Sequence, residues 1–347
     1  MPKVLDLFCG CGGLSYGFEM AGCDILLGID NDIAALKTFE KNHRGAKSIC
    51  TDITQISKKD ISNLINVSDI DIIVGGPPCQ GMSLSGPRKF HDPRNKLYLS
   101  YIRLVSEIMP KIFVIENVPG LASLFEGQIK NSILEEFAKL GYTVSYRIIN
   151  TADFGVPQKR RRIIFVGYKN NHLFNFDNIQ CVNEYVTCHD ALSDLPALDA
   201  DFLGAEVQEY VSNPKNTYQK AMRRKSKVVK NHIAAQHSEH VKQIISLVPE
   251  GGNYKDLPDE YKNTRNFHVA WTRFDGEQPA PTIDTGHRHH FHYKYNRVPT
   301  VRESARLQSF PDHFEFLGTK TQQFKHVGNA VPPLFAMQLA EQILKCL

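Results

Sequence analysis

The stretch VLDLFCGCGGL, residues 4–14, decides the fold class of this chain. Its first five residues are apolar except Asp6 and predict a short buried strand, and the glycine-rich turn 9–13 follows at once. Leu14, Phe18 and Ala21 then recur at helical spacing. A strand, a glycine-rich turn and a helix in this order form the geometry that holds a nucleotide-like cofactor. The turn has neither the G-x-G-x-x-G pattern nor a P-loop lysine, so it indicates a contact smaller and less anionic than a pyrophosphate.

Strands and helices alternate over the first half of the chain. Further strands are predicted at 24–29, 46–51, 69–76, 111–115, 143–149 and 162–167, and helices at 33–42, 97–109 and 129–140. The alternation indicates an α/β fold with a doubly wound, mostly parallel sheet. From about 170 to 291 the chain is polar and irregular. Regular patterns return as helices at 301–308 and 331–347, the second with Asn329 as its expected N-cap and prolines in its first turn.

Two acidic residues follow the second and third strands. Asp30 stands where a carboxylate can accept hydrogen bonds from ribose hydroxyls, and Asp52 where one can accept from an adenine amino group. Each position is equally compatible with a helix cap or a surface turn.

A candidate nucleophile follows the strand at 69–76. The stretch DIDIIVGGPPCQ, residues 69–80, places Cys79 just beyond the carboxyl end of a buried strand, after two prolines that stiffen the backbone. A cysteine after a strand is more often a small buried hydrophobe than a nucleophile. This stretch alone therefore leaves both interpretations open.

Composition limits the class of protein. The 347 residues can form one large and one smaller domain, 42% are hydrophobic, and the net charge of +4 permits a nucleic-acid partner without requiring one. No apolar stretch reaches membrane-spanning length, and we expect no signal peptide before the first strand. Eight cysteines without a C-x-x-C pair fit a reducing cytoplasm. The clustered histidines lack completing ligands, so no metal is expected.

Six motifs, in order, resemble those of the DNA (cytosine-5) methyltransferase family. They are DLFCGCGGL (6–14), GGPPCQGMS (75–83), IENV (115–118), PQKRRR (157–162), RESARLQSFP (302–311) and GNAVPP (328–333). The resemblance implies a Rossmann-like domain that uses S-adenosyl-L-methionine, with a smaller inserted target-recognition domain. It implies a catalytic and cofactor-binding domain at 1–169, target recognition at 170–291, a hinge and connecting motif at 292–317, and a C-terminal segment at 318–347 that returns to the catalytic domain.

The family's chemistry implies roles for four residues. Cytosine C5 is a poor nucleophile until a thiolate adds at C6, and Cys79 would supply that thiolate. Glu116 follows the apolar residues 112–115 and would bind and protonate N3 of the base, although an ordinary surface acid is the competing interpretation. Arg162 would bind the cytosine O2 and restrain Glu116 and Cys79. Gln80 would hold flanking phosphates or steady its loop.

The resemblance also implies binding residues. For the cofactor these are Phe8, Gly10, Gly12, Gly13, Leu14, Asp30, Asn31, Asp52, Ile53, Pro78, Asn329, Ala330 and Val331. Many relatives carry Glu at the position of Asp30, and an aromatic residue at that of Asn31. For DNA they are Ser83, Ser85, Arg88 and Arg94 in the loop 81–95, with Arg160, Arg223, Arg224, Lys225 and Lys227. The loop would close over a flipped-out cytosine, and the basic cluster at 220–230 would contact phosphates, unless each is only a solvated surface.

The expected function is therefore sequence-specific methylation of cytosine C5 in double-stranded DNA. The compact chain resembles a bacterial modification enzyme of a restriction-modification system, monomeric, cytoplasmic and nucleoid-associated, with a cognate restriction endonuclease as a functional partner. Two alternatives remain: an RNA cytosine-5 methyltransferase, and a catalytically silent DNA-binding regulator. Cys79, Glu116 and Arg162 argue against the regulator. The segment 170–291 favours DNA over RNA.

Overall fold

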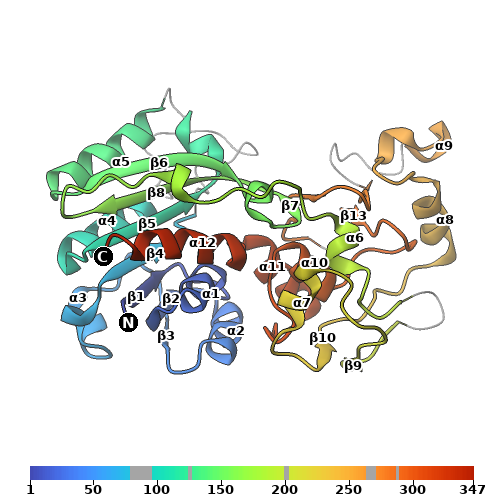
Figure 1. Ribbon diagram of the computed structural model, residues 1–347, viewed down its shortest axis with the longest axis horizontal. Helices are drawn as coiled ribbons and strands as arrows, with labels where there is room; N and C mark the ends of the chain where they lie inside the picture. The colour runs from blue at the N-terminus through green and yellow to red at the C-terminus, as the bar shows by residue number, and fades with distance from the viewer. Residues whose placement is uncertain (79–95, 124–126, 199–202, 263–270, 287–288) are drawn as a thin grey trace. The chain divides into compact units, whose positions relative to one another are not determined.

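The chain folds into two compact units. The computed structural model describes residues 1–78, 96–123, 127–198, 203–262, 271–286 and 289–347 (Figure 1). Unit 1 comprises Met1–Phe154, Arg161–Cys181 and Val331–Leu347, and unit 2 comprises Gly155–Arg160 and Val182–Ala330. No helix in the described part of the chain combines the length and the apolar character needed to cross a bilayer.

Unit 1 is built on a seven-stranded sheet. The strands are β1 (Lys3–Leu7), β2 (Asp24–Asp30), β3 (Lys47–Cys50), β4 (Ile72–Gly75), β5 (Ile112–Asn117), β6 (Thr143–Asn150) and β8 (Arg161–Tyr168). Their order is β3-β2-β1-β4-β5-β8-β6. Strands β1 to β5 pair in parallel, and β8 runs antiparallel between β5 and β6. The doubly wound, mostly parallel α/β fold expected from the sequence is confirmed.

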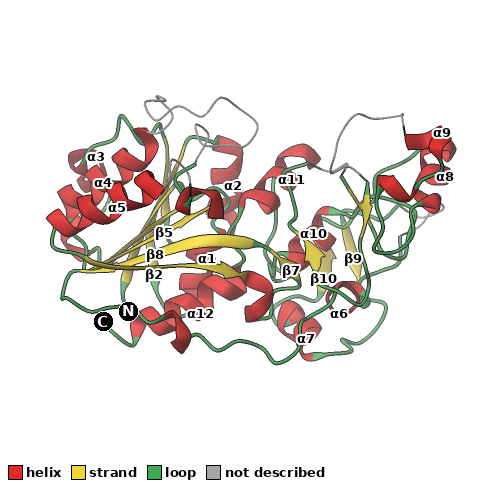
Figure 2. Cartoon of the chain, turned by 90° about the horizontal axis from the view of Figure 1, so that it is seen from above, coloured by secondary structure: helices red, strands yellow, loops and turns green. Residues whose placement is uncertain are grey.

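Helices cover both faces of this sheet (Figure 2). They are α1 (Gly13–Met20), α2 (Ile33–Asn42), α3 (Lys58–Ser62), α4 (Lys96–Ile108), α5 (Gln128–Lys139) and α12 (Pro333–Leu344). On one face Leu5, Ile73 and Phe113 join residues of α4 and α5 in a continuous apolar core. Both faces of the parallel strands are therefore buried, as their near-continuous apolar sequences predict.

Helix α12 packs closely against α1. Gly17 makes this possible, since a Cβ there would lie 2.3 Å from the Cβ of Ala336 and 2.6 Å from the backbone nitrogen of Met337. The expectation that Asn329 caps this last helix was wrong. Asn329 is the final residue of α11 (Lys320–Asn329), and Pro332 precedes α12 without a side-chain cap. Pro333, the first residue of α12, has no backbone N–H to satisfy, so a side-chain cap is less needed there.

Unit 2 consists of short elements around a core that contains both apolar and charged side chains. Its helices besides α11 are α6 (Cys188–Leu192), α7 (Thr217–Arg223), α8 (Glu239–Leu247), α9 (Asp259–Lys262) and α10 (Val301–Leu307). Its strands are β7 (Gln158–Lys159), β9 (Val207–Glu209), β10 (Val228–Lys230), β11 (Thr272–Arg273), β12 (Ala280–Pro281) and β13 (His290–Phe291). The sequence between about 170 and 291 therefore contains more helix than its irregular pattern indicated.

The centre of unit 2 holds a buried ion-pair network. Arg306 has no exposed side-chain surface, and its guanidinium lies 3.1 Å from Asp194 and 2.6 Å from Asp312. Nearby, the buried Arg297 donates two hydrogen bonds to the Glu303 carboxylate, at 2.7 and 2.8 Å. These arginines lower the pKa of Asp312 and Glu303, although burial alone would raise both. The motif RESARLQSFP thus contributes much of the internal scaffold of unit 2.

Candidate active site

The glycine-rich turn leaves β1 and begins α1 in a left-handed conformation. Gly12 precedes the first helical residue with φ of 92°, a region that favours glycine. Gly10 is also left-handed, and a Cβ built on it would have no atom within 4 Å. At Gly10 the turn therefore has open space beside its backbone, close to the first turn of a helix.

Asp30 holds this turn from the end of β2. One of its carboxylate oxygens accepts a hydrogen bond from the backbone N–H of Gly10 at 2.8 Å, and the other accepts from Asp32 at 2.9 Å. Burial raises the pKa of Asp30, and these backbone bonds partly oppose that shift. The next residue, Asn31, is exposed. Asp52 is also exposed and accepts bonds from the backbone and hydroxyl of Thr54, so in this structure it forms a surface turn.

A second carboxyl group lies beneath the turn. Asp6 of β1 is fully buried and accepts a hydrogen bond from the Ser15 hydroxyl of α1 at 2.5 Å. Its other oxygen has no hydrogen-bond partner among the described residues. Burial raises the pKa of Asp6 to about 7, with the Ser15 bond acting in the opposite direction. Sequence reasoning missed this group, although an acid inside an apolar strand is a visible signal.

Glu116 and Arg162 meet at the ends of β5 and β8. Nε of Arg162 lies 2.8 Å from Oε1 of Glu116, and both side chains are largely buried. The two groups form an ion pair, while Oε1 has no aligned hydrogen-bond donor among the described residues. A carboxylate held this way keeps acceptor capacity for a ligand.

The segment that leads to the predicted nucleophile lies beside Glu116. A Cβ built on Gly76 would lie 3.1 Å from Oε2 of Glu116. Asn117 donates from its side-chain amide to the Pro77 carbonyl at 2.8 Å. The residues just before Cys79 are thus fixed against the end of β5. Cys79 and Gln80 themselves lie outside the described residues, as do Ser83, Ser85, Arg88 and Arg94.

A family model described as C-5 cytosine-specific DNA methylase matches residues 2–345. The chain belongs to this family. Type II methyltransferase M.DdeI of Desulfomicrobium norvegicum is 39% identical over 98% of this chain and 88% of its own. Type II methyltransferase M1.HphI of Haemophilus parahaemolyticus is 37% identical over 98% of this chain and 86% of its own. A prophage-encoded protein of E. coli, described as a DNA modification methyltransferase, shares 28% identity at a TM-score of 0.83 and covers 99% of each chain.

Family membership makes the chain a DNA cytosine-C5 methyltransferase and confirms the resemblance drawn from the six motifs. Of the cofactor residues expected by resemblance, Phe8, Gly10, Gly12, Gly13, Leu14, Asp30, Asn31, Asp52, Ile53, Pro78 and Val331 belong to unit 1, and Asn329 and Ala330 to unit 2. Among the described residues no cluster of His, Cys, Asp or Glu side chains is arranged to hold a metal ion.

The basic residues that are expected to contact DNA differ in how far their side chains are exposed to solvent. Arg224, Lys225 and Lys227 are exposed. Arg223 is committed to unit 2, since it pairs with Asp194 and its guanidinium lies 3.6 Å above the Tyr210 ring. Arg160 is 2% exposed, and its guanidinium donates to the carbonyl oxygens of Ile283 and Asn329, each at 3.5 Å. Burial of this kind argues against a direct phosphate contact for Arg160.

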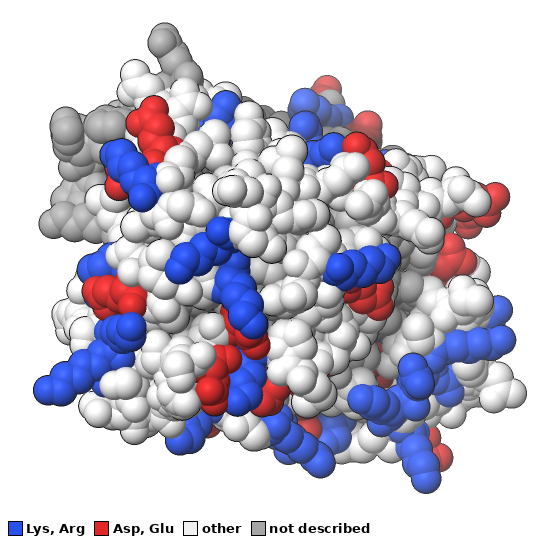
Figure 3. Space-filling model, turned by 60° about the vertical axis from the view of Figure 1, so that its left-hand side comes forward, with Lys and Arg blue, Asp and Glu red and all other residues white. Residues whose placement is uncertain are grey.

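One face of the molecule carries charges of both signs (Figure 3). On the face drawn in Figure 3, acidic side chains lie beside many of the lysine and arginine side chains. Unit 1 contains ion pairs of this kind, such as Lys111 with Asp71 and Arg147 with Asp177. A large field of one sign would be expected to attract any polyanion, whereas mixed charge leaves nucleic-acid binding to particular clusters.

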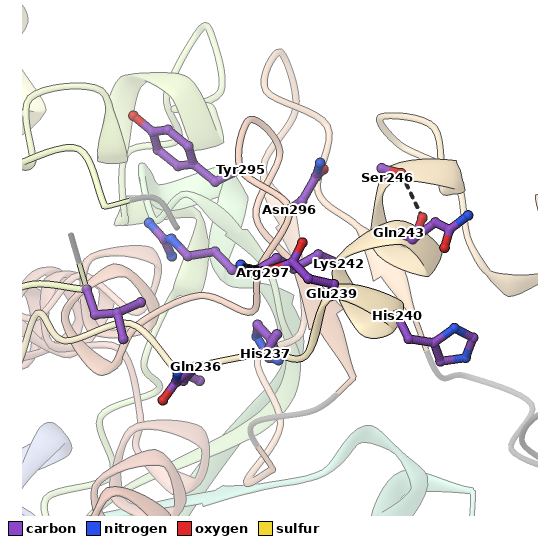
Figure 4. A pocket seen from close by; sticks show the side chains of 12 residues that line it. Gln236, His237, Glu239, His240, Lys242, Gln243, Ser246, Tyr295, Asn296 and Arg297 are labelled. Carbon is purple, nitrogen blue, oxygen red and sulfur yellow. Dashed lines mark hydrogen bonds and ion pairs between the residues drawn. The ribbon is translucent and has the colours of Figure 1, made fainter. Parts of the chain in front are cut away.

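Unit 2 also contains a polar hollow of about 900 Å³ (Figure 4). The segment 235–246, which includes most of α8, forms one side, and the turn 295–297 forms another. Its lining residues are Leu203, Ala235, Gln236, His237, Glu239, His240, Lys242, Gln243, Ser246, Tyr295, Asn296 and Arg297. Gln236 and Gln243 are exposed, and side-chain amides can read base edges in the major groove. The sequence offered only scattered polar residues here, with no motif to single them out.

Proposed function

We propose that this methyltransferase modifies cytosine C5 within a specific short sequence of duplex DNA, with S-adenosyl-L-methionine as methyl donor, as the modification enzyme of a type II restriction-modification system. The observation that carries the proposal is the buried Glu116–Arg162 pair beside Gly76 and Pro77, just before Cys79. The printed names of the relatives, type II methyltransferases, support the biological setting.

The reaction needs three actions from the protein. The Cys79 thiolate adds to C6 of a flipped-out cytosine, the electron pair moves toward N3, and the Glu116 carboxyl group, which must carry a proton at this step, delivers it to N3. Arg162 holds the Glu116 carboxyl in place. C5 is thereby made nucleophilic, and the bound donor supplies an electrophilic methyl group. Transfer of the C5 proton to water then lets the bond from Sγ to C6 break, which releases the Cys79 thiolate, and N3 returns its proton to Glu116.

The glycine-rich turn at residues 9–13, called the cofactor turn below, fits the proposed methyl donor. Its open side at Gly10 leaves room for a ligand to approach the backbone, and Asp30 is positioned next to that turn. The N–H groups of the first α1 turn favour a negatively charged group such as a carboxylate. No pyrophosphate-binding lysine is needed for such a ligand.

Methyl transfer from radiolabelled S-adenosylmethionine tests the proposal directly. Duplex DNA is expected to accept the label and RNA of the same sequence is not. Bisulfite or nanopore sequencing of plasmid DNA from cells that express the protein would then give the target sequence. Labelling of RNA in preference to DNA would support the RNA alternative, and binding without any methyl transfer would support the silent regulator.

Target recognition by the segment 170–291 is the second part of the proposal. Exchanging this segment for that of a relative is expected to change the methylated sequence and not the chemistry, because Cys79, Glu116 and Arg162 lie outside it. The exposed Lys225 and Lys227 provide a contrast. Their joint replacement by alanine should weaken binding to every duplex and reduce the salt dependence, with the preferred site unchanged. An active chimera that kept its original site would assign recognition to the catalytic segment.

A further inference from the structure

His43 lies directly beneath the cofactor turn. It follows the last residue of α2, and its side chain has no exposed surface. Nε2 of its ring lies 3.2 Å from the carbonyl oxygen of Gly12, and Nδ1 lies 2.7 Å from Oε2 of Glu19 on α1. One imidazole therefore connects the end of α2, the helix α1 and the turn between β1 and α1.

The contacts restrict both the ring and the turn. A carbonyl oxygen can only accept, so the contact with Gly12 is a hydrogen bond in the forms of the ring that carry a hydrogen on Nε2. Phe39 packs against the ring, with centroids 4.3 Å apart. A Cβ built on Gly12 would lie 2.1 Å from Nε2, which shows how closely the backbone of the turn approaches the ring. The imidazole thus supports the left-handed conformation of Gly12 from below.

We infer that His43 is a positioning residue that holds the glycine-rich turn in the shape that binds the methyl donor, with Glu19 orienting its ring. The inference rests on the proposed use of S-adenosylmethionine at this turn. His43 contacts neither Glu116 nor the residues that precede Cys79 in any described interaction. Its loss should therefore weaken cofactor binding more than it affects the chemical step.

Two amide substitutions separate the two ring contacts. The side-chain nitrogen of glutamine lies near the position of Nε2, and that of asparagine near the position of Nδ1. His43→Gln can thus still donate to Gly12, while His43→Asn can reach only toward Glu19. We expect S-adenosylhomocysteine, measured by calorimetry, to bind His43→Asn about tenfold more weakly than wild type, the factor that one net hydrogen bond supplies. His43→Gln should recover most of that loss.

Further readouts separate positioning from general stability. In His43→Asn, KM for the methyl donor should rise more than kcat falls. Backbone amides of the turn should exchange hydrogen faster even without cofactor. Tyr142→Phe is the matched control, because it removes a buried hydrogen bond to the Pro110 carbonyl in the same unit. It should lower thermal stability without changing the dissociation constant. Glu19→Gln, at a half-exposed position, should weaken binding by a smaller factor than His43→Asn.

Equal affinity in the asparagine and glutamine variants would overturn the inference. The inference would also be overturned if every variant, including Tyr142→Phe, lost affinity in proportion to its loss of thermal stability. Failure of the wild-type protein to bind S-adenosylhomocysteine would instead refute the proposed cofactor. In that case the amide exchange of the cofactor-free protein would still test whether His43 holds the turn.

Discussion

Replacement of Asp6 by asparagine should change how stability depends on pH. Burial raises the pKa of Asp6 to about 7, whereas in an unfolded chain an aspartate titrates near 4. Between these two values the folded protein binds a proton that the unfolded chain does not, so the free energy of unfolding falls as pH rises. A shift of this size corresponds to at most about 4 kcal/mol, fully present below about pH 4 and lost above about pH 7.

Asparagine resembles the protonated form of Asp6 and cannot ionise. We therefore expect the free energy of unfolding of Asp6→Asn, minus that of wild type, to rise by about 1 kcal/mol per pH unit through this window and then level off. Urea unfolding at a series of pH values measures the difference, in which contributions from other titrating groups cancel. Ser15→Ala, which removes the bond that lowers the pKa, should move the wild-type transition to higher pH. Parallel pH profiles for wild type and Asp6→Asn would refute the reasoning.

Four other substitutions test separate parts of the structure. Glu116→Gln should reduce methyl transfer by about 10²–10⁴-fold with DNA binding retained; a loss below about tenfold would make Glu116 a bystander. Gly17→Ala should destabilise the protein by about 1–3 kcal/mol in urea, because the clash with α12 exceeds the gain of up to about 1 kcal/mol in helix propensity; unchanged stability would contradict the close packing. Arg306→Met should cost about 3–5 kcal/mol by removing the arginine partner of the buried Asp312 and one of the two arginine partners of Asp194, and a neutral effect in the same assay would argue against the network. Gln243→Ala should relax the methylated sequence seen by sequencing, whereas an unchanged site would exclude that side chain from base reading.

Local patterns made much of unit 1 predictable. The strand, turn and helix at residues 3–20 and the position of Glu116 at the end of β5 follow from short apolar runs bounded by glycines or polar residues. The antiparallel placement of β8 was not visible, because pairing direction depends on contacts between distant segments. Family motifs located Cys79 and Glu116 but gave no partner for His43, whose two contacts lie 24 and 31 residues away.

Unit 2 was less predictable for a physical reason. Sequence rules treat charged residues as surface, and here Arg302 and Arg306 are fully buried. Arg306 pairs with Asp312, six residues away, and with Asp194, 112 residues away, while Arg302 donates to the nearby carbonyl of Pro311. Arg160, which the family resemblance placed among the DNA-contact residues, is buried as well. In contrast, α8 has apolar residues at helical spacing, so a closer examination of periodicity would have found it.

Covalent trapping on 5-fluorocytosine tests the central claim most directly. Duplex DNA with 5-fluorocytosine at the methylated position is incubated with the protein and S-adenosylmethionine. Because fluorine cannot leave C5 as a proton does, the bond between Cys79 and C6 should persist and give a denaturant-resistant protein–DNA complex. Cys79→Ser should form no such complex and transfer no methyl groups while still binding duplex DNA. Absence of the complex with wild-type protein, or near-normal turnover by Cys79→Ser, would contradict the account.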